Sequence, residues 1–169
     1  MGLIYGGNML ELRKATESDY EILCGLSVTE SQAEFVLPVS DTWTEKKAEE
    51  DFYVICLKET DAEELVIGFF LIDRSFANHQ TFRTYGDLGL RSFFIDKAHQ
   101  GKGYGKEACL QLGPFVKDNY PQSEKLVLTV NVRNPKARAL YLACDFVDTQ
   151  QLYLGGPVGP QHILSLSVK

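Results

Sequence analysis

The sequence lacks any apolar run close to the roughly 20 residues that a membrane-spanning helix needs. Its opening has no basic segment followed by an apolar stretch, which a secretory signal would show. It also lacks a CxxC pair, because Cys24, Cys56, Cys109 and Cys144 are widely spaced. These absences predict a cytoplasmic protein with no metal site, in which the cysteines are small buried side chains rather than disulfide partners or metal ligands.

An excess of positive charge is also missing. The chain has 17 Lys and Arg against 23 Asp and Glu, so its net charge is −6 at pH 7. We therefore expect neither nucleic acid nor an anionic membrane as the main partner, whereas a cationic amine is compatible with this charge. Repeats, low-complexity tracts and linkers are absent, which predicts one domain over residues 9–169. Residues 1–8, MGLIYGGN, are interpreted as an N-terminal extension or a cloning remnant.

Hydrophobic patterning predicts strands alternating with helices. Apolar runs or alternation indicate seven strands, over 9–15, 52–57, 65–73, 85–96, 125–131, 146–153 and 163–168. Helices are predicted after Thr16, over 31–36, over 45–51 with Thr44 as N-cap, after the glycines near 105, and after Asn134 with Pro135 at the first position. The sequence thus predicts an α/β domain with a mixed sheet of about seven strands and about four helices.

The stretch from Leu90 to Gly105 connects an aromatic strand to a helix through a glycine-rich turn, QGKGYG. Such a turn at a helix N-terminus suits a phosphate-bearing ligand, because the first helical amides have no internal partners and the glycines allow close backbone approach. A P-loop would need Ser or Thr after the lysine, but Glu107 follows Lys106. A dinucleotide fingerprint would need a different glycine spacing, earlier in the chain. The third interpretation is the pyrophosphate turn of an acetyltransferase.

A second motif favours the third interpretation. Residues 134–141, NPKARALY, match the pattern N-x-x-A-x-x-L-Y, and Phe146 follows where a closing aromatic residue is expected. With FFID before the glycine turn, the chain resembles the GNAT superfamily of N-acetyltransferases over nearly its whole length. It looks closest to the bacterial branch that includes small-amine and polyamine acetyltransferases. The resemblance implies a single-domain GNAT fold with a mostly antiparallel sheet. Asp145 replaces the usual glycine at the end of the helix that begins after Asn134, a change that Asp tolerates because it adopts left-handed φ more readily than most residues.

The resemblance implies acetyl-CoA as the cofactor. Amides of Gly101–Lys106 would hold its pyrophosphate, the backbone of Phe93–Ile95 would hold the pantetheine arm, and an amide near Ile95 would stabilise the oxyanion. Tyr141 would be the general acid that protonates the departing thiolate. The implied cofactor-binding residues are Phe93, Phe94, Ile95, Gln100, Gly101, Lys102, Gly103, Tyr104, Gly105, Lys106, Asn134 and Tyr141.

The general base stays open at this point. An amine is protonated at neutral pH, so a group or a water chain must accept its proton before attack. The candidates are Asp87, Tyr85, Glu30, Glu34 and His79.

We expect transfer of acetyl from acetyl-CoA to a primary amine by direct attack through a tetrahedral intermediate. The acceptor is expected to be a small amine or polyamine first, and a peptide N-terminus or lysine second. The alternative is a non-catalytic CoA-binding or regulatory module on the same scaffold. A homodimer is compatible with the hydrophobic C-terminal strand.

Overall fold

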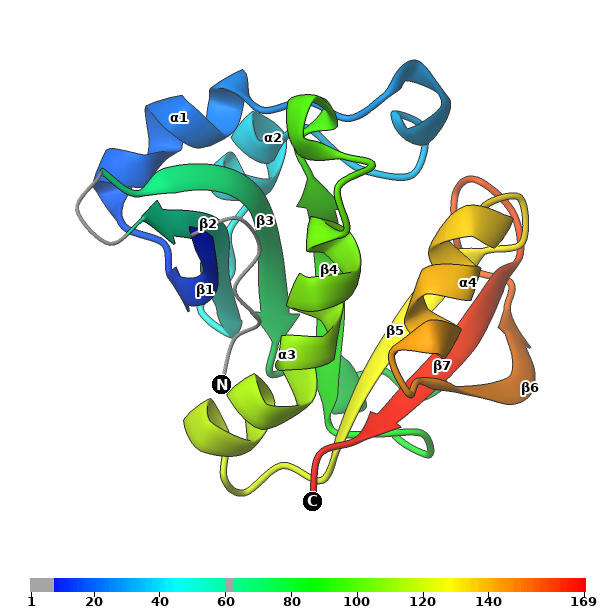
Figure 1. Cartoon of the computed structure of the whole chain (residues 1–169). Coiled ribbons are helices and arrows are strands. Elements are labelled where there is room, and N and C mark those ends of the chain that lie inside the picture. The colour runs from blue at the N-terminus through cyan, green and yellow to red at the C-terminus, as the bar shows by residue number, and fades with distance from the viewer. Residues whose placement is uncertain (1–7, 60–62) are drawn as a thin grey trace. The chain divides into compact units, whose positions relative to one another are not determined.

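The computed structural model describes residues 8–59 and 63–169, and these contain both strands and helices (Figure 1). The strands are β1 (Asn8–Lys14), β2 (Glu50–Glu59), β3 (Leu65–Asp73), β4 (Leu88–Ile95), β5 (Lys125–Asn131), β6 (Val147–Tyr153) and β7 (Gln161–Ser167). The α-helices are α1 (Tyr20–Gly25), α2 (Val39–Thr44), α3 (Tyr104–Asn119) and α4 (Pro135–Ala143). Single 3₁₀ turns lie at Glu17–Asp19, Glu30–Gln32, Phe76–Asn78 and Lys97–His99. Residues 1–7, most of the predicted extension, lie outside the described part.

The strands form one seven-stranded sheet in the order β1-β2-β3-β4-β5-β7-β6. β1 pairs with β2, and β7 pairs with both β5 and β6, in antiparallel ladders. β4 and β5 are parallel, as expected for strands joined by a crossover helix, here α3. Their ladder consists of two pairs at the beginning of the strands, Leu88 with Leu126 and Gly89 with Val127. The predicted α/β fold, with a mostly antiparallel sheet of seven strands and four helices, is confirmed.

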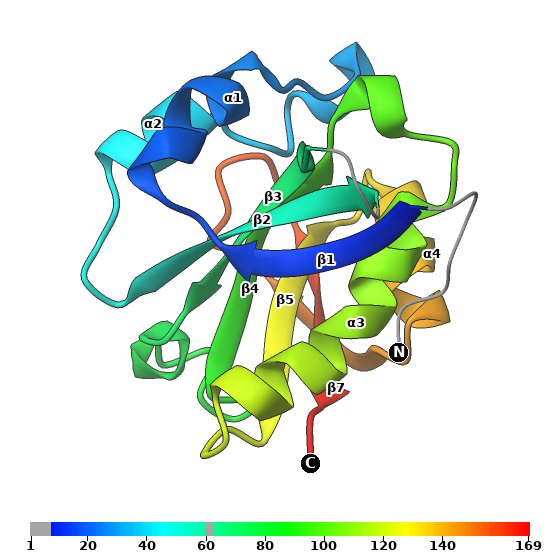
Figure 2. The same ribbon diagram turned by 60° about the vertical axis from the view of Figure 1, so that its left-hand side comes forward.

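The chain divides into two compact units, and the first comprises residues up to Leu71 together with Ser92–Ala108. In this unit α1 and α2 lie side by side (Figure 2). A series of packed aromatic rings extends from α1 to the sheet and consists of Tyr20, Trp43, Phe52, Phe69 and Phe94. The centroids of consecutive rings lie 5.3 to 6.4 Å apart. Phe52, Phe69 and Phe94 of this series are buried and belong to the apolar core of the unit, and Trp43 packs against that core. β3 is buried from its second residue to its last, which confirms the prediction from its continuous apolar run.

The second unit comprises Ile72–Arg91 and Cys109–Lys169. Its own apolar cluster is formed by Phe76 and Phe82 from the β3–β4 connection with Val127 and Ile163 from the sheet. A β-carbon at Gly89 would lie 2.3 Å from the ring of Phe76, so only glycine allows that ring to pack on β4. This packing orders the connection between β3 and β4.

The helix predicted over 45–51 is wrong. The helix lies earlier, as α2 over Val39–Thr44, and β2 already begins at Glu50. Thr44 is the last residue of α2, and its hydroxyl donates to the carbonyl of Ser40 at 2.8 Å instead of capping a following helix. The physical reason is burial, because α2 brings Val39 and Trp43 against the core, whereas 45–49 is charged and polar. The helix predicted over 31–36 is also reduced, to one 3₁₀ turn over Glu30–Gln32.

Asp19 forms a part-buried ion pair with Arg13 in the first unit, and its charge makes stability depend on pH. Arg13 binds both of its carboxylate oxygens at 2.9 Å, and the amide of Thr16 donates to it at 2.7 Å. The Arg13 guanidinium, followed by these hydrogen bonds from Thr16, lowers the pKa of Asp19 to about 2.

We expect Asp19→Asn to lose about 2 kcal/mol of unfolding free energy at pH 7, from the lowered pKa relative to about 3.9 in the unfolded chain. A carboxyl with a lowered folded pKa stabilises fully above its unfolded pKa, and this contribution disappears as pH falls toward 2. Urea unfolding at pH 7 and pH 3 should therefore show a smaller difference between wild type and variant at pH 3. The exposed Glu17→Gln serves as a control that should change little, and an equal loss for both variants at pH 7 would contradict this role.

Candidate functional site

The glycine turn predicted as a phosphate site has the backbone conformation that requires glycine. Gly101 has φ +76° and Gly103 has φ +85°, a region that L-residues with a side chain rarely occupy. A β-carbon at either position would meet no atom within 4 Å, so the conformation rather than crowding explains both glycines. The turn therefore presents its backbone to open space, which a bulky anionic ligand could fill.

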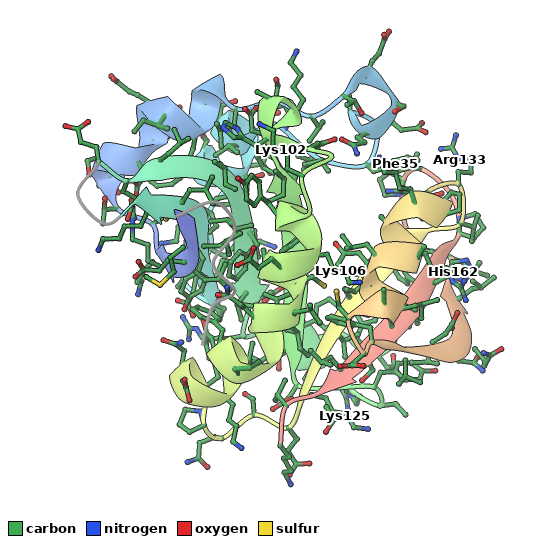
Figure 3. All side chains as sticks on the ribbon, viewed as in Figure 1. Phe35, Lys102, Lys106, Lys125, Arg133 and His162 are labelled. Atoms are coloured by element: carbon green, nitrogen blue, oxygen red, sulfur yellow. The ribbon has the colours of Figure 1, made fainter. Side chains whose placement is uncertain are left out.

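The helix α3 begins immediately after this turn. The amide of Glu107, in the first turn of α3, donates to the carbonyl of Gly103, the residue directly before the helix, at 3.0 Å. The amides of Tyr104 and Gly105 therefore belong to the first turn, where helical amides have no partner within the helix. Lys102 and Lys106, labelled in Figure 3, add exposed positive side chains near these amides. The turn and the helix start thus combine backbone donors with positive charge.

The end of β4 precedes the turn and is fixed by its side chains. Phe94 and Ile95 are buried, and the half-buried Phe93 ring packs 6.2 Å from Phe70. Gly68 on β3 lies beneath this segment, because a β-carbon there would come within 2.5 Å of the carbonyl of Phe94. The backbone of Phe93–Ile95 is therefore held firmly by packing on the first unit.

Ser92, directly before Phe93, has φ +55° in the middle of a strand. A left-handed non-glycine residue at this place costs of order 1–2 kcal/mol and breaks the regular alternation of the strand. No feature of the sequence indicated this conformation. Such an outlier beside a proposed ligand-binding segment is a further sign that the backbone geometry here serves a site.

Asn134 and Tyr141 lie on α4 in the second unit. Asn134 is the N-cap, its side-chain oxygen accepting from the amide of Ala137 at 3.3 Å, and Pro135 follows at the first helical position, as predicted. Tyr141 is buried, with its ring 5.5 Å from that of Phe146. Burial, followed by the neighbouring thiols of Cys109 and Cys144, raises the pKa of Tyr141 above its ordinary value. Its hydroxyl is therefore protonated across the physiological pH range.

Asp145 lies two residues after the end of α4 and has φ +68°, so the left-handed conformation expected for this residue is confirmed. Because glycine adopts this conformation without strain, we expect Asp145→Gly to raise the unfolding free energy by about 0.5–1 kcal/mol. Thermal or urea unfolding measures this gain. Asp118→Gly, an exposed change inside α3, should lower stability instead, and a loss for both variants would contradict the assignment.

The candidate general bases are dispersed. Asp87 accepts the amides of Glu124 and Lys125 at 3.0–3.3 Å, so its carboxylate fixes the start of β5. His79 stacks against Phe82, with centroids 4.7 Å apart, and its Nδ1 accepts from the amide of Thr81 at 3.3 Å. Tyr85 packs beside the apolar cluster of the second unit. The remaining two, Glu30 and Glu34, are exposed in the first unit.

The predicted site residues thus form two sets. One set contains the end of β4, the glycine turn and the start of α3, all within the first unit. The other contains Asn134 and Tyr141 on one helix of the second unit.

In the described part of the chain, no helix has the length and apolar character to cross a membrane.

Comparison with known proteins identifies the family of the chain. The sequence pattern of the acetyltransferase (GNAT) family matches residues 11–146. The uncharacterized N-acetyltransferase YbbJ of Bacillus subtilis (strain 168) is 35% identical over 115 residues, which cover 66% of this chain and 67% of that protein. The chain therefore belongs to the GNAT acetyltransferase family, and it is an acetyl-CoA-dependent acetyltransferase.

Solved structures share the fold at low identity. The spermidine N-acetyltransferase from Vibrio cholerae, solved with CoA and spermine, has a TM-score of 0.66 at 20% identity and covers 94% of this chain and 95% of its own. The aminoglycoside acetyltransferase AAC(6')-Ib, solved with kanamycin and coenzyme A, has a TM-score of 0.71 at 18% identity, with 94% of each chain covered.

Proposed function

We propose that the protein transfers acetyl from acetyl-CoA to a primary amine, with a small amine or polyamine as the first expectation and a peptide N-terminus or lysine as the second. The observation that supports binding of acetyl-CoA is the turn of Gly101 and Gly103, in which both residues have positive φ. The turn is open to a ligand and is followed directly by α3. The anionic pyrophosphate fits this place, because backbone amides, the helix dipole and the side chains of Lys102 and Lys106 all favour negative charge.

The pantetheine arm would bind along the backbone of Phe93–Ile95. The side chains of these residues pack within their own unit, and an extended amide-bearing ligand would contact their backbone. Ser92, with its φ of +55°, would turn the backbone so that an amide near Ile95 meets the thioester oxygen. Asn134 would add a contact from the start of α4 alongside its role as N-cap.

Tyr141 would act as the general acid. When the amine attacks the thioester carbon and the carbon–sulfur bond breaks, the sulfur leaves as a thiolate that must gain a proton. A buried tyrosine with a raised pKa is fully protonated at neutral pH and can donate that proton. The protein's own residues thus provide binding, orientation and a proton, whereas acetyl-CoA provides the activated acyl group.

The acceptor class rests on two observations. Structures with a similar fold include one enzyme solved with spermine and one solved with kanamycin, both of which are polycationic amines. The net charge of −6 favours a cationic acceptor over an acidic one. Neither observation distinguishes a polyamine from an aminoglycoside, so the experiment must compare them.

A panel of acceptors tests the proposal. Spermidine, spermine, kanamycin and a peptide with a free N-terminus are each incubated with acetyl-CoA, and both thiol release and the acetylated product are measured. We expect transfer to at least one polycationic amine, with kcat/KM above that of the peptide. Binding of CoA without transfer to any amine would favour the alternative of a non-catalytic CoA-binding module.

A further inference from the structure

A network of hydrogen bonds joins the segment Ser27–Gln32 to the segment between β4 and the glycine turn. The amide of Ser27 donates to the carboxylate of Asp96 at 2.9 Å, and the amide of Lys97 donates to the carbonyl of Ser27 at 2.7 Å. Further along, the side chain of Gln100 donates to the side chain of Gln32 at 2.9 Å. All these residues belong to the first compact unit.

Gln100 is the residue directly before Gly101, and its side-chain nitrogen donates two hydrogen bonds within the protein. An amide nitrogen carries two hydrogens, and in Gln100 they bind the carbonyl of Ile95 at 2.8 Å and the oxygen of Gln32 at 2.9 Å. The side chain therefore faces the protein and is not a donor for a ligand. These two hydrogen bonds fix the position of Gln100, the residue from which the glycine turn begins.

Gln32 is itself held in place. Its side-chain oxygen also accepts from the amide of Thr29 at 3.3 Å, as part of the capping box that begins the Glu30–Gln32 turn. An acceptor with a fixed position and a half-buried environment holds its donor in one orientation. Gln32 thus determines where the Gln100 side chain lies.

The glycine turn is therefore anchored at both ends. Gln100 fixes its beginning, and the bond from Glu107 to Gly103 fixes its end at α3. Between these anchors, glycines with φ of +76° and +85° would otherwise sample many conformations. Fixing the turn before the ligand arrives lowers the ordering cost of binding.

We propose that Gln32 is a positioning residue for the glycine turn, acting through the side-chain amide of Gln100. This inference rests on the proposed function, in which the turn binds the pyrophosphate of acetyl-CoA. It assigns a role in donor binding to a residue 68 positions away from the turn in sequence. Removing the acceptor oxygen of Gln32 should leave the Gln100 amide half-satisfied and the turn less ordered.

The first test is CoA binding, measured by titration calorimetry on wild type, Gln32→Leu, Gln100→Leu and the double variant. We expect Gln32→Leu to weaken CoA binding about tenfold, from the typical effect of leaving one part-buried donor unpaired. Because Gln32 acts through Gln100, the double variant should bind CoA no more weakly than Gln100→Leu alone. Additive losses, or unchanged binding by Gln32→Leu, would overturn the inference.

The second test separates positioning of the turn from general damage. S-Acetylpantetheine carries the thioester and the pantetheine arm but lacks the pyrophosphate. We expect Gln32→Leu to raise KM for acetyl-CoA about tenfold while kcat at saturation and kcat/KM for S-acetylpantetheine stay within about twofold of wild type. An equal loss with both donors would overturn the inference. If wild type itself does not bind CoA, the proposed function fails instead, so the two failures are distinguishable.

Discussion

Tyr141→Phe is expected to lower kcat for acetyl transfer by roughly 10²-fold or more, the usual range for removing a positioned acid. The variant keeps the ring that packs against Phe146 and loses only the hydroxyl. Because that hydroxyl would act on the departing sulfur, its loss should appear in kcat, with the dissociation constant for CoA nearly unchanged. Steady-state kinetics with acetyl-CoA and the best acceptor of the panel, together with calorimetric CoA binding, measure the two quantities.

Tyr53→Phe is the matched control for this prediction. Tyr53 is also a buried tyrosine, but it lies on β2 with its ring 5.2 Å from that of Phe70. The same chemical change there should leave kcat within about twofold, since no transition-state contact is removed. If Tyr141→Phe retains the wild-type kcat, Tyr141 is a packing residue and water or another group protonates the thiolate.

Gly103→Val is expected to weaken CoA binding by about tenfold or more. A β-branched residue at φ +85° is strained by at least 1–2 kcal/mol, and relief of that strain would rotate the amides that follow it. Since 1.4 kcal/mol corresponds to a factor of ten, a turn that must be forced back into shape by the ligand loses at least this much affinity. Calorimetry with CoA measures the loss directly.

Gly159→Val is the control, because it also places a β-branched residue at a positive φ, but in a different loop. Gly159 lies in the β6–β7 loop with φ +106°, and a β-carbon there would also meet no atom within 4 Å. Both variants should lose similar unfolding free energy in urea, but only Gly103→Val should lose CoA affinity. Equal CoA affinity in the two variants would mean that the glycine turn does not hold the ligand.

Elements with a strong local pattern could be predicted from sequence with little error. β3 and β5 begin and end where their apolar runs do. Strands that are buried on both faces appear in the sequence as short continuous apolar runs, so the limits of the run give the limits of the strand. The start of α4 also follows from local chemistry, since Asn134 and Pro135 satisfy the two requirements of a helix N-terminus within consecutive residues.

Features that depend on distant partners could not be predicted. Residues 45–51 have good helix formers, yet the helix forms earlier, because Trp43 finds partners in Tyr20 and Phe52. The contact between Gln100 and Gln32 joins residues far apart in sequence, neither of which shows a distinctive pattern. Ser92 shows no local sign of its left-handed φ. The motifs of the proposed donor site were therefore visible in the sequence, whereas the contacts that hold those motifs in place were not.

Acetyl transfer itself is the most direct test of a site built from the glycine turn and Tyr141. Wild type and Tyr141→Phe are incubated with acetyl-CoA and the amine panel, and mass spectrometry of the amine is followed together with release of the CoA thiol. We predict that wild type forms an acetylated amine and free thiol in equal amounts, and that Tyr141→Phe does so far more slowly. Release of thiol without an acetylated amine, or equal rates for the two proteins, would contradict this mechanism.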